Sequence, residues 1–313
     1  MGLGVIIEFE GVTKRYGSVA ALDDATLTIE EGSITGLIGP NGAGKTTSME
    51  IIASLIGRDG GRVRVGGHDP RENPRGVRSL VGYMPDFFGV YENLVSREYL
   101  DFFAAASGVA SKARPRVVAD LLALVDLEGK ADADVNGLSR GMKQRLSLAR
   151  ALVHDPDVLI LDEPASGLDP RARVHLRELI AELARMNKTV LISSHILAEL
   201  QGICSHLAIV DNGKVVVEGS VRDIRVALQG STLVVLRAPH NQLETAEGLL
   251  RERSGAQDLV VERDHIAMRI PGTEDDLASV LAMLVGEGVA VWEWRVESAG
   301  LEELFLQLTG PSE

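Results

Sequence analysis

GPNGAGKT, residues 39–46, fits the phosphate-loop pattern G-x-x-x-x-G-K-[S/T] at every required position. An apolar stretch at residues 33–40 leads into the loop and predicts a short strand, and residues 46–57 follow with helical spacing. In such a strand–loop–helix unit, backbone amides of the loop and the helix N-terminus surround phosphate oxygens. The stretch therefore predicts a P-loop nucleotide site in an α/β fold.

The residues of this loop have distinct expected roles. Gly39, Gly42 and Gly44 permit backbone turns that a side chain makes costly. Lys45 is expected to place a positive charge on the β- and γ-phosphates, and the Thr46 hydroxyl is expected to ligate Mg²⁺. The positions expected to bind the nucleotide through the loop are consecutive: Gly39, Pro40, Asn41, Gly42, Ala43, Gly44, Lys45, Thr46 and Thr47.

A second stretch, DVLILDEP at residues 157–164, ends an apolar strand in two acidic residues. A parallel strand delivers its C-terminal residues to the crevice where ligands bind. We expect Asp162 to orient the water shell of the metal. Glu163 is the next residue, so its side chain points in a different direction from that of Asp162 and can reach the attacking water. We expect it to be the catalytic general base that activates this water.

Composition and charge limit the classes of protein to consider. The 313 residues are 45% hydrophobic and 25% charged, as in an ordinary globular protein, and the length predicts one large and one smaller domain. No apolar run approaches the roughly 18 residues needed to cross a bilayer. The net charge of −13 argues against a nucleic-acid partner. Cys204, the single cysteine, excludes an intramolecular disulfide and favours the cytosol.

The pattern of strands and helices predicts two domains. In residues 1–228, apolar strands alternate with helices, which predicts an α/β core with a largely parallel sheet and a helical subdomain at about residues 86–153. Residues 229–313 hold most of the net negative charge and read β-α-β-β-α-β followed by a final helix. That order is typical of the ferredoxin-like arrangement, so we expect a small α+β accessory domain at the C-terminus.

LSRGMKQR, residues 138–145, resembles Leu-Ser-Gly-Gly-Gln, the signature of the ATP-binding cassette (ABC) ATPases. The chain keeps Ser139 and Gly141 of that signature, whereas Arg140 replaces the first glycine and Met142 the glutamine. Ser139 is expected to cap the following helix, and Gly141 to leave the helix start able to hold phosphate. The resemblance implies that these two residues bind the nucleotide held by a second ATPase subunit.

Further motifs of the same family occur in the expected order across residues 5–225. SGLD, residues 166–169, resembles the D-loop that follows the catalytic glutamate, and His195 occupies the place of the switch histidine. The resemblance implies that His195 contacts the γ-phosphate and takes part in catalysis. Tyr16 resembles the aromatic residue that stacks on adenine. The implied fold is a P-loop NTPase domain of the ABC type with its helical subdomain.

The resemblance also implies a function and partners. LEELFLQLTG, residues 301–310, looks like the end of ATPase subunits of exporters whose permease is a separate chain. The implied protein binds and hydrolyses ATP with Mg²⁺ and drives a membrane permease from the cytoplasmic face as a peripheral subunit. Two copies, or one copy and a homologous partner, would close head to tail around two ATP molecules.

The stretch YMPDFFGVYENL, residues 83–94, gathers aromatic residues around Asp86. In ABC ATPases a glutamine stands at that place, senses Mg²⁺ and precedes the groove that receives a short permease helix. An ionised aspartate only accepts hydrogen bonds, so Asp86 is able to meet the metal shell but not to donate to a phosphate oxygen. The aromatic residues expected to line the docking groove are Phe87, Phe88 and Tyr91; their alternative is to fill the core of the helical subdomain.

Two other readings remain open from the sequence. The first is a soluble ABC-type ATPase switch that acts on another cytosolic machine without transport. The second treats residues 231–313 as a regulatory module that binds a small molecule. The transported substrate is not readable from this chain, because a permease would hold it.

Overall fold

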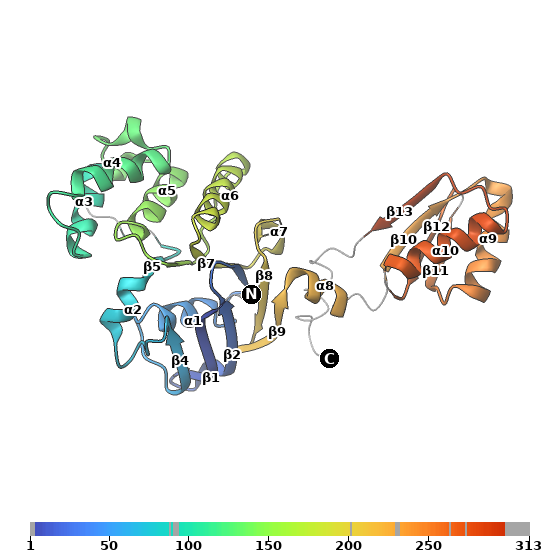
Figure 1. Cartoon of the computed structure of the whole chain (residues 1–313), viewed down its shortest axis with the longest axis horizontal. Helices are drawn as coiled ribbons and strands as arrows, with labels where there is room; N and C mark the ends of the chain where they lie inside the picture. Colours follow the sequence, from blue (N-terminus) through green and yellow to red (C-terminus); the bar gives the residue numbers. More distant parts are fainter. Residues whose placement is uncertain are drawn as a thin grey trace. The chain divides into compact units, whose positions relative to one another are not determined.

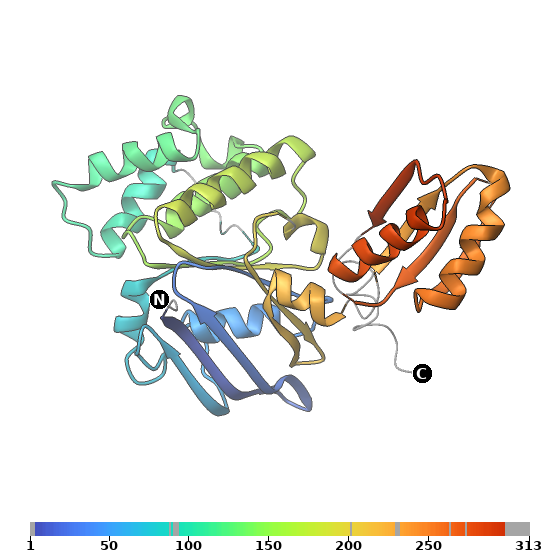
Figure 2. The same ribbon diagram turned by 45° about the vertical axis from the view of Figure 1, so that its right-hand side comes forward.

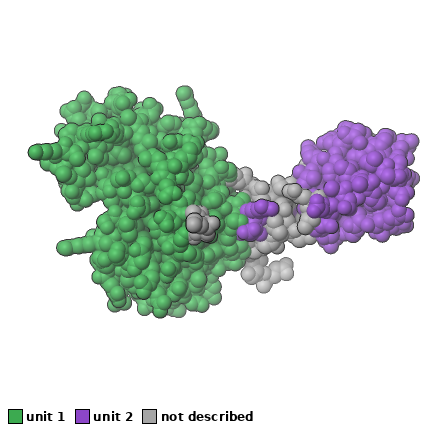
Figure 3. All heavy atoms as spheres, in the orientation of Figure 1, with its two compact units in different colours: residues 1–221 green, residues 222–313 purple. Residues whose placement is uncertain are grey.

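The computed structural model describes residues 4–87, 89, 94–200, 202–228, 232–262, 264–272 and 274–297. The chain forms two compact units, residues 1–221 and 222–313, shown in different colours in Figure 3. The division falls at the start of helix α8 (Val221–Leu228), whereas the predicted domain boundary lies at the end of that helix. Within the described part of the chain, no helix is both long and apolar enough to cross a membrane.

A six-stranded sheet forms the centre of the first unit. Its strand order is β5 (Val81–Met84), β6 (Val158–Leu161), β7 (Thr189–Ser194), β3 (Ile34–Ile38), β8 (His206–Asp211) and β9 (Lys214–Ser220). The first five strands are parallel, and β9 returns antiparallel after a turn at Asn212–Gly213. Strands β3, β6 and β7 are buried throughout, which explains why their sequences read as continuous apolar runs.

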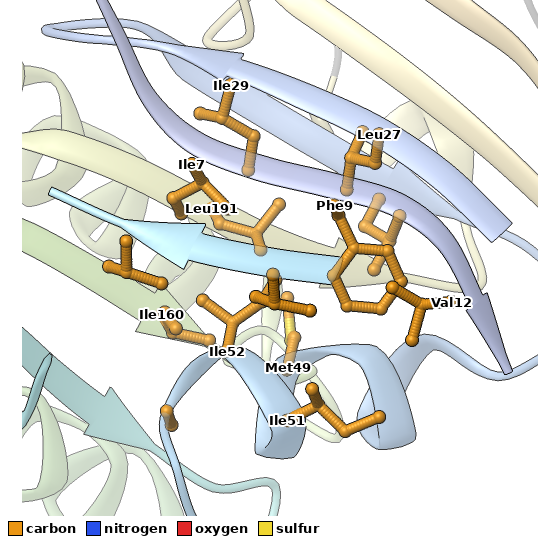
Figure 4. Packing of buried hydrophobic residues seen from close by; sticks show 14 of the residues in the cluster. Ile7, Phe9, Val12, Leu27, Ile29, Met49, Ile51, Ile52, Ile160 and Leu191 are labelled. Carbon is orange, nitrogen blue, oxygen red and sulfur yellow. The ribbon is translucent and has the colours of Figure 1, made fainter. Parts of the chain in front are cut away.

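A second, antiparallel sheet packs with the first around one helix. It contains β2 (Val19–Glu30), β1 (Val5–Tyr16) and β4 (Gly60–Val65) in that spatial order. Helix α1 (Lys45–Ile52) follows the glycine loop, and Figure 4 shows its apolar side chains reaching between the sheets. Met49 and Ile52 of this helix belong to one buried cluster with Phe9 of β1 and Ile160 of β6. The helix that carries the loop is therefore anchored by both sheets.

The remaining helices of the first unit are α2 (Pro74–Leu80), α3 (Ser96–Ala106), α4 (Arg114–Leu124), α5 (Arg140–Ala151), α6 (Pro170–Arg185) and α7 (Leu197–Leu200). Two short 3₁₀ turns, Glu128–Lys130 and Val135–Gly137, join α4 to α5. Helices α3, α4 and α5 contact one another and form a separate group in Figures 1 and 2. This group lies in the region predicted as the helical subdomain.

The second unit has the predicted ferredoxin-like order. After α8 it contains β10 (Thr232–Arg237), α9 (His240–Arg253), β11 (Gln257–Val261), β12 (Ile266–Ile270), α10 (Glu274–Gly286) and β13 (Glu293–Glu297). Its sheet order is β11-β12-β10-β13, with every neighbouring pair antiparallel. Alternate residues of β10 and β12 are buried with α9 and α10, which confirms the predicted α+β architecture. The helix predicted at residues 301–310 lies outside the described residues.

Candidate active site

The carboxyl ends of the parallel strands bring the predicted site residues to one edge of the sheet. β3 leads into the glycine loop, β6 into Asp162 and Glu163, and β7 into His195. Backbone hydrogen bonds join these segments: the Asp162 amide donates to the Met84 carbonyl at 2.8 Å, and the Gly39 amide donates to the Ser194 carbonyl at 3.4 Å. Residues far apart in the sequence therefore meet where ligands bind in parallel α/β sheets.

Two glycines of the loop hold positions that exclude a side chain. A Cβ atom on Gly39 would lie 2.1 Å from the Val210 carbonyl oxygen. Gly44 has a φ of 107°, and a Cβ atom there would lie 2.5 Å from the Ala21 carbonyl oxygen. The loop is thus pressed against β8 and β2 and takes backbone angles that favour glycine.

The start of α1 offers backbone donors to an anion. Gly44 is the N-cap residue and has no side chain to occupy the first amides of the helix. Those amides have no acceptor within the helix, and the helix dipole makes this end positive. Together with the tight glycine loop, this helix start fits the phosphate groups of a nucleotide.

Lys45 is held inside the loop. Its side chain is only 6% exposed, and Nζ donates to the Gly39 carbonyl at 2.7 Å and to the Pro40 carbonyl at 3.2 Å. The same ammonium lies 3.4 Å from Oε1 of Glu163. A buried ammonium is stable only with such acceptors around it, so the loop fixes where the positive charge sits.

Glu163 links the loop to the predicted switch histidine. Its Oε2 lies 2.8 Å from Nδ1 of His195, while Oε1 faces Lys45. Glu163 has a φ of 46°, a left-handed conformation that costs a non-glycine residue energy. The Glu163 amide donates to Oγ of Ser193 at 2.8 Å, which helps to hold this conformation. The bend separates the Glu163 side chain from that of its neighbour Asp162.

Asp162 faces the start of α1. The residue is 1% exposed; its Oδ2 accepts from the Thr46 hydroxyl at 2.8 Å and its Oδ1 from the Ser193 hydroxyl at 2.6 Å. The sequence assigns no role to Ser193. The signal that would have found it is strand register: Leu161 of β6 pairs with Ile192 of β7, so the residues that follow are neighbours.

Asp86 follows β5 and lies near the same carboxylates. Partial burial raises the pKa of its carboxyl, and the negative charges of Asp162 and Glu163 raise it further. The positive charge of Arg140 and His195 acts in the opposite direction. Asp86 is therefore part of a group of neighbouring carboxylates whose mutual repulsion a cation would relieve.

The signature-like segment begins α5 as predicted. The Ser139 Oγ accepts from the Met142 amide at 3.3 Å and caps the helix. Arg140, treated in the sequence only as a departure from the family, lies against the loop 166–169. Its Nη2 is 3.5 Å from the Ser166 Oγ, and a Cβ atom on Gly167 would lie 2.2 Å from its Cζ. The Arg140 guanidinium thus occupies the space that a side chain at position 167 would need.

Ser139 and Gly141 are not joined to the glycine loop of their own chain. Among the hydrogen bonds of the described residues, none connects either of them to residues 39–46. A Cβ atom on Gly141 would make only ordinary contact with Ala172, so the surroundings tolerate a small side chain there. The structure therefore joins the loop, Asp162, Glu163 and His195 by direct contacts, and Ser139 and Gly141 are not part of that set.

Tyr16 ends β1 and is half-exposed. The ammonium of Lys14 lies 5.4 Å from the centre of its ring. Tyr16 pairs with Val19 across the β1–β2 hairpin, and β2 continues to Leu22, which contacts the position of Gly44. The hairpin that carries the ring is thus attached to the glycine loop through β2.

The structure describes only one of the three aromatic residues that are predicted to line the docking groove. Phe88 and Tyr91 lie outside the described residues, whereas Phe87 is 80% exposed. The helical subdomain also has a groove of about 740 Å³ between α3 and α4. Phe102, Val118 and Leu122 are among its apolar lining residues, and Arg97 and Asp101 are among its charged ones.

Three comparisons with known proteins show the family to which the chain belongs. The ABC transporter family matches residues 22–166. Nod factor export ATP-binding protein I of Burkholderia orbicola is 34% identical over 312 residues, which cover 97% of each chain. A solved ATP-binding subunit of an ABC transporter is 32% identical, with a TM-score of 0.64 over 70% of this chain and 92% of that chain. A dimeric ATP-binding cassette in a post-hydrolysis state, bound to ADP and Pi, is 25% identical, with a TM-score of 0.62 over 69% of this chain and 99% of that chain.

Proposed function

The chain belongs to the ATP-binding proteins of ABC transporters, and from this membership we propose that it powers export through a separate membrane permease. As a member of that family it is an ATP-binding and ATP-hydrolysing subunit. The export direction is supported by the relative that is named an export ATP-binding protein and aligns over nearly all of both chains. In this proposal the protein is a peripheral subunit at the cytoplasmic face of the cell membrane.

The contacts from Lys45 through Glu163 to His195 are the observation that carries the proposed chemistry. One carboxylate oxygen of Glu163 faces the Lys45 ammonium, and the other faces His195. Phosphate oxygens compete with that carboxylate because both are anionic partners of the same ammonium. ATP binding therefore releases Glu163 from Lys45, and the freed carboxylate accepts a proton from the attacking water. His195, next to the same carboxylate, contacts the γ-phosphate and registers its presence.

Two side chains next to the glycine loop, those of Thr46 and Asp162, are suited to binding Mg²⁺. The Thr46 hydroxyl and the Asp162 carboxylate lie 2.8 Å apart and offer the oxygen ligands that this ion prefers. Thr46 would hold the ion directly, and Asp162 would hold its water shell. When bound, Mg²⁺ supplies positive charge to the phosphate oxygens as negative charge develops on them. We assign Asp86 to the same metal shell.

A complete site needs two ATPase subunits in this proposal. No hydrogen bond among the described residues joins Ser139 or Gly141 to the loop of their own chain, and Ser139 is exposed at the start of α5. A relative of this fold is dimeric with ADP and Pi bound. Ser139 and Gly141 of one subunit therefore bind the ATP that the partner's loop holds, with Tyr16 stacked on the adenine. Loss of the γ-phosphate contacts after hydrolysis favours opening of the dimer.

Replacing Asp86 with asparagine is expected to raise the Mg²⁺ concentration for half-maximal ATPase about tenfold, since loss of an outer ligand typically weakens metal binding roughly 10- to 100-fold. The physical reason is that the carboxylate lies among like charges that a cation would balance. Titration of Mg²⁺ at saturating ATP measures the shift. Glu218→Gln is the control, because burial also raises the pKa of the Glu218 carboxyl, whereas its polar partner is Thr28 and not Asp162. An unchanged Mg²⁺ curve for Asp86→Asn would remove Asp86 from the metal shell.

The permease is proposed to dock on the helical subdomain, around Phe87, Phe88 and Tyr91. Phe87 is compatible with this because its ring is 80% exposed and therefore accessible to a partner. The groove between α3 and α4 adds an apolar floor with charges around it, the composition of a protein interface. A short amphipathic helix of the permease is the partner that fits such a groove.

Replacing Phe87 with serine is expected to leave basal ATPase unchanged and to abolish co-purification with the permease. The ring makes no packing contribution to the core that would be lost, because it is exposed. The measurement is recovery of the integral protein with tagged subunit from gently solubilised membranes. Leu55→Ser, at another exposed apolar residue outside the helical subdomain, is the control and should retain the permease.

The same experiment separates the transporter from the alternative function. If no integral membrane protein accompanies the wild-type chain, a soluble ATPase switch acting on another machine becomes the better explanation. If the permease accompanies both wild type and Phe87→Ser equally, the transporter proposal stands and the docking surface is placed wrongly.

A further inference from the structure

Glu199 is a buried carboxylate that the proposed chemistry does not use. It lies on α7, four residues after His195, and is 6% exposed. Its Oε2 accepts from the Ser194 hydroxyl at 2.8 Å, and its Oε1 lies 3.6 Å from Nη2 of Arg173. Its backbone carbonyl accepts from Nε of Arg177 at 3.1 Å. A charge this buried requires partners, so these contacts determine where α7 sits.

Ser194 uses its hydroxyl to close the turn that carries His195. Its Oγ accepts from the Ile196 amide at 2.9 Å and lies 3.1 Å from the Ile196 carbonyl oxygen. A hydroxyl has one hydrogen and two lone pairs. The Glu199 carboxylate is the nearer and the charged acceptor, so it takes the hydrogen and leaves a lone pair for the amide. The carboxylate thus orients the hydroxyl that holds the residues on both sides of His195.

The same carboxylate joins this turn to the helix that follows the loop 166–169. Arg173 lies in the first turn of α6, which begins at Pro170 directly after Asp169, its N-cap. Nε of Arg173 is buried without a hydrogen-bond partner, and a cavity of about 10 Å³ beside it is lined by Arg173, Arg177, Ser194 and Glu199. A space of that size holds at most a single water molecule, so no other side chain fills the gap beside the Arg173–Glu199 contact. The Glu199 side chain therefore joins the histidine turn to α6 through Arg173.

We propose that Glu199 is a positioning residue for His195: its carboxylate orients Ser194, which holds the histidine turn, and ties that turn to the first turn of α6. The proposal rests on the proposed function, in which His195 and Glu163 act on the γ-phosphate and the attacking water. Glu199 touches no reacting group. It acts by holding His195 where its Nδ1 meets Oε2 of Glu163.

Removal of the carboxylate tests the proposal. Glu199→Ala is expected to lower the kcat of ATP hydrolysis about tenfold, the cost of one lost hydrogen bond to a charged group, with KM for ATP changed less than about twofold. Glu199→Gln should retain most of the rate, because its amide oxygen still accepts from Ser194. Ser194→Ala removes the same hydrogen bond with a smaller change and should match Glu199→Ala, which keeps the test valid if the latter folds poorly.

A double-mutant cycle separates positioning from general destabilisation. If Glu199 acts through His195, then Glu199→Ala should cause no further loss of single-turnover rate in a His195→Ala background. Asp69→Ala is the matched control: Asp69 forms a two-pronged, mostly buried ion pair with Arg58 away from the site, so its loss should lower the melting temperature and leave kcat unchanged.

Three results would overturn the inference. The first is a wild-type kcat in both Glu199→Ala and Ser194→Ala. The second is a Glu199→Gln rate as low as that of Glu199→Ala. The third is a loss of single-turnover rate on Glu199→Ala that is the same in the wild-type and the His195→Ala backgrounds. Each of these leaves the proposed function intact as long as Lys45→Ala and Glu163→Gln still stop turnover. Failure of those two variants to slow hydrolysis would instead reject the site itself.

Discussion

Replacing Lys45 with alanine is expected to lower ATPase by at least about a hundredfold, the typical cost of removing one preorganised donor to developing charge. The ammonium is almost fully buried and is held over the loop by two backbone carbonyls. Without it, the phosphates of ATP would meet the negative charges of Asp162 and Glu163 with less compensation. Phosphate release measures the loss of turnover. Equilibrium binding of a fluorescent ATP analogue measures the loss of nucleotide affinity.

Lys188 provides the matched control for Lys45. It is also largely buried and pairs with Asp155, but it precedes β7 and so lies at the opposite end of that strand from His195. Lys188→Ala should cost about 1 kcal/mol of folding stability or less, because its partner Asp155 is exposed and is solvated once unpaired, and it should leave turnover near that of the wild type. Unchanged ATPase in Lys45→Ala would mean that residues 39–46 are not the site of hydrolysis.

Replacing Glu163 with glutamine is expected to keep ATP binding and slow hydrolysis about a thousandfold, within the range that a general base contributes. Glutamine has nearly the same shape but does not accept the proton of the attacking water. It also removes the anionic partner of Lys45, so ATP no longer competes with a carboxylate for the ammonium. Because the γ-phosphate persists, the closed dimer should accumulate, and light scattering after size-exclusion chromatography with ATP and Mg²⁺ detects it.

The control for Glu163→Gln is Glu218→Gln on β9. Glu218 accepts from the Thr28 amide, and partial desolvation raises the pKa of its carboxyl, so it is a hydrogen-bonded glutamate whose polar partner lies outside the loop. This variant should hydrolyse ATP normally and stay in the wild-type oligomeric state. A Glu163→Gln protein that turns over at the wild-type rate would show that another group activates the water. Dimers that form without ATP would show that closure does not depend on the nucleotide.

Much of the fold could be predicted because its determinants are local in the chain. Buried parallel strands read as apolar runs, and the glycine loop, the acidic strand end and the signature-like segment each have a definite spacing. The order of elements in the second unit was also readable, since strand and helix periodicities differ. The predicted Ser139 cap is present because that side chain needs only the amide three residues later.

The sequence predicts which residues to expect at the site, but it does not predict the contacts among them. The left-handed backbone of Glu163 has no local signature, yet it lets one carboxylate face both Lys45 and His195. Ser193 received no role, because only the β6–β7 register places its hydroxyl beside Asp162. In the sequence, Arg140 is only a departure from the family motif. In the structure, its guanidinium packs on Gly167.

The sequence by itself determined the phosphate loop, the acidic strand end, the signature-like helix start and the two-part architecture. These features depend on neighbouring residues whose spacing sets backbone angles, helix faces and strand ends. Only the tertiary structure decided which side chains meet: Lys45 with Glu163, Asp162 with Thr46, and Glu199 with Ser194. Such contacts join residues from different strands and helices, so they are set by sheet register and burial rather than by spacing along the chain.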